Sequence, residues 1–505
     1  MESLSDTDWD VVISGTGLQQ SLFALALSRS GKKILHVDPQ GYYGGYEAAL
    51  CLEDADAWAE KHASQTANGL FRAAEVTRRA AVPSSRAYNL ALAPQIIHTR
   101  SELLTKLVSS KAFRQIEFQA VGSFFIFQPA AAGPEEAATE AARPALSRIP
   151  STREDVFSST VIPVRAKRSL MKFLKFVLDY EAEPQAEIWK PSADKSLAEF
   201  LSSQFNLDAM LQSYVITLTL SMDGNISVED GLVAISRHLS SMGVFGPGFA
   251  AVYPKWGGLS EVCQVGCRAA AVGGAVYMLE TGITNITPRQ DEAIKLNITL
   301  SNDMVVKTKT LFRGSEAAPD NGVWLTRSTA IVNTTMPTLF KAVADGAPTP
   351  SATIVAFPTG SVTDGNGQTS KYPIYAMVHS SDTGECPTGQ CIIYLSTITT
   401  PESKSLLEVA LSSLLQTAAH RQATASILYK LQYEQAGARA PSLHVVEDAA
   451  TIFGPPLLDL AFPDAMLQPV REAWEAFMGH DGVTDAAYLV FEDREGVDED
   501  DIFDG

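Results

Sequence analysis

The sequence predicts an α/β protein in which an all-helical domain interrupts a doubly wound domain. Three observations predict this architecture: a strand–turn–helix–strand pattern over residues 10–38, a helical stretch over 150–243, and strand-like apolar runs after residue 243. Strands that alternate with helices are typical of a mainly parallel sheet. We therefore expect one discontinuous domain, residues 1–149 and 244–505, and one helical domain, residues 150–243.

The first unit of the chain nearly matches a dinucleotide-binding turn. An apolar strand (11–13) leads into Gly15 and Gly17, and a second strand (33–37) ends at Asp38, the position of a ribose-binding acid. The third glycine of such a turn is replaced by Gln20, and the chain lacks the late Gly-Asp pair of flavoproteins. The pattern predicts a flavoprotein-like fold of the FAD/NAD(P)-binding type without a bound cofactor. The turn of Gly15, Gly17 and Gln20 is then vestigial.

Further elements of the doubly wound domain follow from apolar runs. Before the helical domain we expect a helix over 96–109, paired strands over 116–127, and a flexible insertion over 128–150, which is rich in Ala, Glu and Pro. After it, strands are expected at 275–279, 293–301, 328–335, 352–357, 372–380 and 390–399. A helix over 403–430 and a strand over 486–492 complete this domain.

The helical domain contains helices that are apolar on more than one side. Segments 167–180 and 207–220 place apolar residues at helical spacing, and a third helix is expected over 227–242. Met171, Phe176 and Ile216 add apolar side chains outside the main stripe. Such helices can line an apolar groove, for which the candidate residues are Phe173, Leu174, Val177, Leu211 and Val215. Each of these can equally be a residue of the domain core.

The chain is strongly acidic. Against 58 Asp and Glu it has 39 Lys and Arg, a formal net charge of −19, which argues against nucleic acid as a partner because phosphate binding requires basic surfaces. Residues 491–505 hold eight acids and one arginine, so we expect an acidic, disordered tail over 492–505. No run approaches about 20 apolar residues, and the polar N-terminus lacks the order of a signal peptide. A cytoplasmic protein is expected.

Neither a metal site nor a catalytic constellation is expected. The five cysteines include Cys386 and Cys391 in CPTGQC, but no second pair at zinc spacing accompanies them. The eight histidines, among them His36, His98 and His238, are scattered singly. No nucleophile elbow, P-loop or HExxH motif is present.

Three stretches carry a resemblance to one protein family. The segment GTGLQQSLFALALSRSGKKILHVDPQGYYGG (15–45) resembles the N-terminus of the superfamily of GDP-dissociation inhibitors and Rab escort proteins, and YPKWGGLSEVCQVGCRAAAVGGAVYML (253–279) is similar to its second Rab-binding segment. Residues 150–181 resemble the escort branch, with an Arg-x-Asp-Val-Phe motif before a basic Leu-Met-Lys-Phe-Leu helix. The resemblance implies the flavoprotein-like fold without flavin. It also implies a non-catalytic accessory, component A of Rab geranylgeranyltransferase.

The resemblance also implies site residues. Tyr43 takes the place of the Rab-contacting tyrosine of the Tyr-Tyr-Gly-Gly loop, Glu261 and Arg268 those of a Rab-contacting acid and arginine, and Tyr277 and Met278 those of a Tyr-Met pair. A tyrosine beside glycines can instead simply pack a turn. Glu261 and Arg268, seven residues apart, share one face of a helix and can instead pair with each other.

The expected function is that of a Rab escort protein in vesicular transport. The implied partners are GDP-bound Rab GTPases, unprenylated and prenylated, the catalytic heterodimer of the transferase, and geranylgeranyl lipid, with transient membrane contact. The resemblance assigns lipid and transferase binding to the helical domain. Two alternatives are a Rab GDP-dissociation inhibitor that recycles prenylated Rabs and a flavin-dependent oxidoreductase of the same fold.

Overall fold

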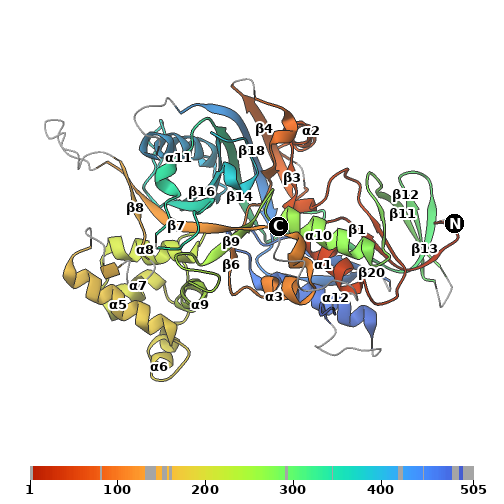
Figure 1. Cartoon of the computed structure of the whole chain (residues 1–505), viewed down its shortest axis with the longest axis horizontal. Helices are drawn as coiled ribbons and strands as arrows, with labels where there is room; N and C mark the ends of the chain where they lie inside the picture. Colours follow the sequence, from red (N-terminus) through yellow and green to blue (C-terminus); the bar gives the residue numbers. More distant parts are fainter. Residues whose placement is uncertain are drawn as a thin grey trace.

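The chain builds two large β-sheets and a group of helices that packs below one of them in the computed structural model (Figure 1). The structure describes residues 4–66, 68–79, 82–130, 144–150, 156–157, 162–289, 294–343, 345–418, 425–446, 449–479 and 488–492. The helices are α1 (Leu18–Leu27), α2 (Leu52–Lys61), α3 (Glu102–Ser109), α5 (Val164–Leu178), α6 (Gln185–Trp189), α7 (Leu197–Phe205), α8 (Ala209–Thr219), α9 (Val228–Ser241), α10 (Leu259–Val272), α11 (Ser403–Ala418) and α12 (Gln468–Met478).

The first sheet holds the N-terminal strand and is mainly parallel. Its order is β10–β2–β1–β13–β12–β11, and β13 also pairs in parallel with β20, which pairs with β19. Their bounds are β1 (Asp8–Ser14), β2 (Ile34–Val37), β10 (Val276–Met278), β11 (Ile283–Pro288), β12 (Leu296–Leu300), β13 (Val305–Gly314), β19 (Leu443–Val446) and β20 (Ala450–Phe453). On one face Val11 and Ile13 share a core with α1, α10 and α12, whereas Val12 packs against β12 on the other.

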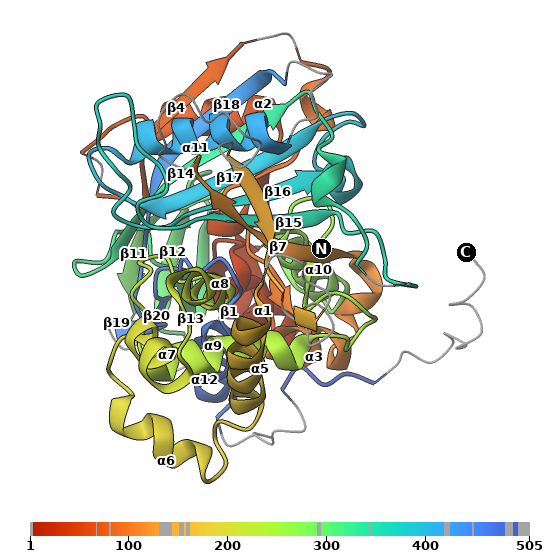
Figure 2. The same cartoon turned by 90° about the vertical axis from the view of Figure 1, so that its left-hand side faces the viewer.

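The second sheet has the order β4–β18–β14–β17–β16–β15–β7–β9–β6, and β8 pairs with β7. Their bounds are β4 (Phe71–Arg78), β6 (Ile97–His98), β7 (Phe118–Gln128), β8 (Ala145–Arg148), β9 (Ala251–Pro254), β14 (Val323–Val332), β15 (Ala352–Phe357), β16 (Ile374–Ser380), β17 (Cys391–Ile398) and β18 (Ile427–Gly437). A separate short ribbon pairs β3 (Ala49–Leu50) with β5 (Leu90–Ala91). Helix α11 covers one face of the second sheet, and α5 and α7–α9 pack against the other (Figure 2).

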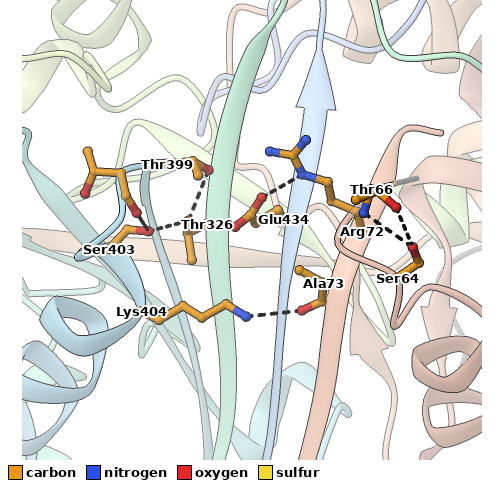
Figure 3. A network of polar contacts seen from close by, with 10 residues as sticks. Ser64, Thr66, Arg72, Ala73, Thr326, Thr399, Ser403, Lys404 and Glu434 are labelled. Atoms are coloured by element: carbon orange, nitrogen blue, oxygen red, sulfur yellow. Dashed lines mark hydrogen bonds and ion pairs between the residues drawn. The ribbon is translucent and has the colours of Figure 1, made fainter. Parts of the chain in front are cut away.

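A polar network ties four elements of the second sheet together (Figure 3). Arg72 of β4 forms a 2.8 Å ion pair with Glu434 of β18, and its guanidinium lies 3.8 Å from the centre of the Trp324 ring on β14. Lys404 of α11 donates to the carbonyl of Ala73 at 3.4 Å. The contacts hold α11 and the edge strand β4 in register with the buried strands between them.

Several expected elements differ in the structure. The long helix ends at Ala418, and residues 427–437 form the buried strand β18 instead of a continuation of that helix. Residues 116–127 form one long strand, β7, and not a pair. The segment 96–109 begins with the short strand β6 before α3. Within the described residues 488–492, no strand is present.

The expected flexible insertion is partly an ordered hairpin. Residues 145–148 of that segment form β8, which pairs antiparallel with Phe125–Gln128 of β7, so the expectation of an unstructured 128–150 was wrong there. Residues 131–143 lie outside the described part of the chain. The expected acidic tail lies outside it as well, beyond residue 492.

Candidate functional site

The glycine turn after β1 keeps the backbone of a dinucleotide-binding turn. Gly15 has a φ of +89°, which glycine adopts without strain, and Gly17 is the N-cap of α1. Nε2 of His36, on β2, lies 2.6 Å from the Gly15 carbonyl oxygen. The turn therefore lies at the carboxyl ends of β1 and β2, where α/β sheets bind their ligands.

The side chain of Gln20 packs against the glycines of this turn. Gln20 is 4% exposed. A Cβ atom built on Gly17 would lie 3.0 Å from Gln20 Oε1, and one built on Gly314 of β13 would lie 2.4 Å from Gln20 Nε2. The amide thus occupies the place where a pyrophosphate approaches the backbone in nucleotide-binding relatives of this fold.

A carboxyl group of the protein occupies the N-terminus of α1. Oε2 of Glu47 accepts a hydrogen bond from the Leu18 backbone N–H at 3.2 Å. A helix N-terminus favours negative charge and is the phosphate site of dinucleotide-binding folds. Burial raises the pKa of Glu47 to about 7, and the hydrogen bond from Leu18 opposes that effect. Glu47 therefore fills the anion site of the turn from within the chain.

Asp38 is fully engaged by the protein. Its Oδ2 accepts from both the backbone N–H and the hydroxyl of Thr16 at 2.7 Å, and its Oδ1 accepts from the backbone N–H of Gln40 at 2.8 Å. Burial raises the pKa of this carboxyl group, and these hydrogen bonds oppose the rise. The Thr16 hydroxyl in turn accepts from the Gly44 N–H at 3.1 Å. Asp38 thus positions the loop that carries Tyr43.

The residues present do not fit a dinucleotide or a flavin. Gln20 and Glu47 fill the pyrophosphate position, and the Asp38 oxygens are bonded to neighbouring residues of the chain. A cleft of about 670 Å³ opens in front of the turn, and its lining includes Gly15, Gly17, Gln20 and Asp38 together with Trp58 and Lys61 of α2. The fold is retained, whereas the contacts that would hold the cofactor are replaced by contacts within the protein.

The loop carrying Tyr43 lies against the start of helix α10. Gly44 has a φ of +107°, and a Cβ atom there would lie 3.2 Å from the hydroxyl oxygen of Ser260 at the start of α10. The half-buried ring of Tyr43 lies 6.5 Å from the ring of Tyr277, nearly edge to face. Burial raises the pKa of Tyr43 and the neighbouring charge of Arg268 opposes the rise, which places the guanidinium near the phenol.

Glu261 and Arg268 both belong to α10. Because they are seven residues apart, they lie on the same face of this helix. Arg268 is exposed and Glu261 is half-buried. Burial raises the pKa of Glu261, and the charge of Arg268 lowers it. In the part of the chain that the structure describes, no ion pair joins the two side chains. The two charges therefore interact over a distance longer than that of an ion pair.

On the opposite face of α10, small residues allow this helix to pack closely against α1. A Cβ atom on Gly266 would lie 3.2 Å from the carbonyl oxygen of Ser21, and one on Gly273 would lie 2.2 Å from that of Ser28. The Cys267 sulfur lies 3.3 Å from the Ser21 hydroxyl. This close approach fixes the height of α10, and with it Glu261 and Arg268, relative to the glycine turn.

Tyr277 and Met278 lie on opposite faces of the first sheet. They belong to β10, which pairs with β2, and successive residues of a strand alternate between faces. Tyr277 packs with α10 and has its hydroxyl beside the Cys267 thiol, where burial raises the pKa of the phenol well above its usual value. Met278 packs with β12 on the other face. The structure therefore brings Tyr277 to Tyr43 but separates Met278 from them.

The five candidate lipid residues lie in the core between the helices and the second sheet. Phe173 and Val177 are 0% exposed, and Leu174, Leu211 and Val215 are also buried. The Phe173 ring packs edge to face on Phe205 at 5.2 Å. In this structure these five residues are core residues that stabilise the packing of the helices. Their contact with lipid stays a prediction.

Two of the histidines form a buried pair. His98 and His238 are buried with ring centres 5.7 Å apart, and burial lowers the pKa of each, to about 4 for His238. Among the described residues, no group of His, Cys, Asp and Glu could hold a metal ion. Cys386 and Cys391 are free and buried.

Sequence reasoning missed a buried network beneath the start of α10. Glu385 accepts hydrogen bonds from Tyr253 at 2.7 Å and from Tyr394 at 3.0 Å, and its other contact is His379 Nδ1 at 2.7 Å. The Tyr253 hydroxyl lies under the turn at Gly258, where a Cβ atom would be 2.7 Å from it. These residues come from separate strands and loops, so no spacing in the sequence could reveal them.

Over the ranges that the structure describes, no helix is both long and apolar enough to cross a membrane.

Solved structures with this arrangement include two from distant organisms. The Rab GDI of Plasmodium falciparum matches with a TM-score of 0.64 at 18% identity over 93% of this chain and 97% of that one. An oxidoreductase from Methanosarcina mazei matches with a TM-score of 0.57 at 11% identity over 92% of this chain and 100% of that one. The similarity confirms the expected flavoprotein-like fold with a helical insertion.

Sequence relatives carry two kinds of name. A "Rab proteins geranylgeranyltransferase component A" of Saccharomyces cerevisiae is 30% identical over 414 residues, 80% of this chain and 64% of that protein, and one of Candida albicans is 29% identical over 79% and 61%. A Rab GDP-dissociation inhibitor of S. cerevisiae is 24% identical over 66% and 70%. The chain thus spans a little under two thirds of the length of the two component A proteins. The model of the family described as GDP dissociation inhibitor matches residues 5–454, so this chain belongs to the GDP dissociation inhibitor family.

Proposed function

We propose that this protein is a Rab escort protein. It binds a GDP-bound Rab GTPase, presents it to the catalytic heterodimer of Rab geranylgeranyltransferase, holds the lipidated product away from water and delivers it to membranes. The protein contributes binding and orientation, and the transferase contributes the prenyl chemistry.

The surface formed by the Tyr43 loop and α10 is the observation that carries this proposal. Tyr43, Glu261 and Arg268 come from two segments that lie together because Asp38 and Thr16 hold the loop and because glycines seat α10 on α1. Glu261 and Arg268, two described residues that form no ion pair with each other, can pair with complementary charges on a GTPase. Such charge pairs govern the specificity and the rate of association. We propose Tyr277 as a support for Tyr43. Met278, on the other sheet face, contacts Rab only at a second, separate patch.

A lipid-carrying role fits the helical group. Each methylene removed from water is worth about 0.8 kcal/mol, so a free geranylgeranyl chain strongly favours membranes or aggregation. We propose that residues 150–243 form the domain that takes up this chain and docks the transferase. Because Phe173, Leu174, Val177, Leu211 and Val215 are buried, lipid reaches them only when the helices separate.

The escort function is favoured over recycling by the names of the more similar relatives. The proteins at 30% and 29% identity are component A proteins, whereas the inhibitor of S. cerevisiae is 24% identical. A flavin enzyme is disfavoured because Gln20 and Glu47 occupy the pyrophosphate position.

Rab binding by single-residue variants tests the proposed surface. Glu261→Ala and Arg268→Ala should each weaken binding of GDP-bound Rab about tenfold, about 1.4 kcal/mol, without changing the melting temperature. Glu75→Ala and Arg79→Ala, which remove exposed charges at the distant edge strand β4, are matched controls. Unchanged affinity in both α10 variants would remove these residues from the site.

A further inference from the structure

Helix α5 is the basic element of an acidic protein. Residues 164–178 contain five Lys and Arg and no Asp or Glu, although the whole chain has a net charge of −19. The helix lies at the outer edge of the molecule in Figure 1 and at the front of Figure 2. The positive charge of α5 therefore contrasts with the acidic composition of the chain as a whole.

Four of the cations form one line along the exposed side of α5. Arg165, Arg168, Lys172 and Lys175 are all exposed, and their spacing of three and four residues keeps them on one helix face. We call these four residues the basic stripe. With a rise of 1.5 Å per residue, the stripe is about 15 Å long.

An apolar row runs beside the basic stripe. Val164, Met171 and Leu178 follow one another at intervals of seven residues, so they line up next to the cations. Val164 is 68% exposed and Leu178 is 58% exposed, and Met171 between them is half-buried. Two large apolar side chains thus remain in water at the two ends of the row.

The basic stripe has no acidic partner within the described residues. The neighbouring Lys167 differs, because it donates to the Phe157 carbonyl oxygen at 2.9 Å. Of the stripe, only Lys172 has a close contact, 5.6 Å above the Phe205 ring. One exposed acid, Asp179, follows directly after the helix. Over the described ranges, ion pairs of the stripe therefore do not contribute to the stability of the fold.

We propose that the basic stripe docks the protein on an anionic phospholipid bilayer. The helix presents cations beside exposed apolar side chains. The cations can contact the anionic head groups, and the apolar side chains can enter the acyl-chain region beneath them. Lysine is depleted at the centres of protein interfaces but arginine and methionine are enriched there, so a protein contact is the alternative that the experiment below separates from membrane binding. The inference extends the proposed delivery of prenylated Rab, since it brings the helical group to the membrane.

The remaining charge of the protein makes this docking directional and reversible. The net negative charge of the chain is repelled by an anionic membrane, so an approach that presents the basic stripe is favoured. Such attraction falls off within a Debye length, about 8 Å at physiological ionic strength. The protein should therefore bind weakly and leave the membrane as salt rises.

Flotation of the full-length protein with vesicles tests this inference without any Rab. The probes are phosphatidylcholine vesicles with and without phosphatidylserine. The stripe variant carries Arg165→Gln, Arg168→Gln, Lys172→Gln and Lys175→Gln. The control variant removes the same charge from exposed cations on other elements, Arg79→Gln, Lys295→Gln, Lys341→Gln and Lys371→Gln. All eight positions are exposed or nearly so, and melting temperatures confirm that the variants are folded.

The wild type should bind phosphatidylserine vesicles in a salt-sensitive manner and bind phosphatidylcholine alone much less. Removal of each stripe cation should weaken binding about fivefold, so the stripe variant should lose binding on the order of a hundredfold or more while the control variant retains it. Equal binding to both vesicle types, or equal losses in both variants, would overturn the inference. Retained vesicle binding with a selective loss of transferase stimulation would also overturn it and make the stripe a protein contact. Because no Rab is present, this outcome is independent of Rab binding.

Discussion

Replacement of Glu47 by glutamine tests the argument that this residue fills the anion site as a buried acid whose pKa is raised to about 7. The glutamine side chain has the same shape, and its carbonyl oxygen can still accept the hydrogen bond from the Leu18 N–H. The substitution therefore removes only the ability to ionise. Glu47 is buried against the N-terminus of α1, so no solvent compensates its charge.

The size of the effect follows from the pKa of Glu47, which burial raises from 4.5 to about 7. One pKa unit is worth about 1.4 kcal/mol, so the folded state favours the protonated acid by about 3 kcal/mol relative to the unfolded chain. Between pH 4.5 and 7 the native state binds the proton that the unfolded state has lost, and the free energy of unfolding falls as pH rises. This contribution is complete below pH 4.5 and lost above pH 7.

The assay is urea denaturation of the wild type and Glu47→Gln between pH 5 and pH 8. The two proteins should differ little at pH 5, and at pH 8 the variant should be more stable by about 2–3 kcal/mol. Glu60→Gln, at an exposed position of α2, controls for the loss of one negative charge. A variant that is less stable at pH 8 would show that the fold does not raise the pKa of Glu47 and that the charge of this residue stabilises α1.

Three further substitutions examine other parts of the site. Gly273→Ala should destabilise the protein by about 1–3 kcal/mol in thermal melts and weaken Rab binding, because the new Cβ atom would lie 2.2 Å from the Ser28 carbonyl oxygen; Gly365→Ala, where a Cβ atom meets nothing within 4 Å, is the control. Phe173→Ala should cost about 3–5 kcal/mol of stability as a core residue, and a small loss together with lost lipid binding would instead place it in a preformed lipid groove. Gln20→Gly should be purified without flavin absorbance, since Glu47 still occupies the end of α1, and a yellow protein would show that Glu47 alone does not exclude the cofactor.

The parts of the fold with a strong local pattern were predictable from the sequence. The glycine turn, the helices at 164–178 and 209–219, and the strand Ala352–Phe357 follow from residue spacing alone. Strand β18 was missed because its sequence ILYKLQYEQAG continues, without a Gly or Pro, a helical stretch, and only its neighbours β4 and β14 make it a strand. Strand β13 was missed too, although it lies beside β1, because its run VVKTKTLFRG has four consecutive polar residues in the middle and lacks the alternation of a strand.

For the candidate site, the sequence predicted single residues better than their arrangement. Family resemblance placed Glu261 and Arg268 on one segment, and α10 places them on one helix. It could not reveal that Tyr277 and Met278 face opposite sides of the sheet, because that follows from the pairing of β10 with β2. Glu47 was not noticed because its role depends on contact with Leu18, 29 positions earlier in the chain.

Lipidation of a GDP-bound Rab by purified geranylgeranyltransferase, with and without this protein, tests the proposed escort function most directly. Attachment of geranylgeranyl groups should depend on the protein and should fall with Arg268→Ala at limiting concentration, while Arg79→Ala supports the wild-type rate. Lipidation that is equally fast without the protein, or absent in its presence while the protein still extracts prenylated Rab from membranes, would contradict the escort function.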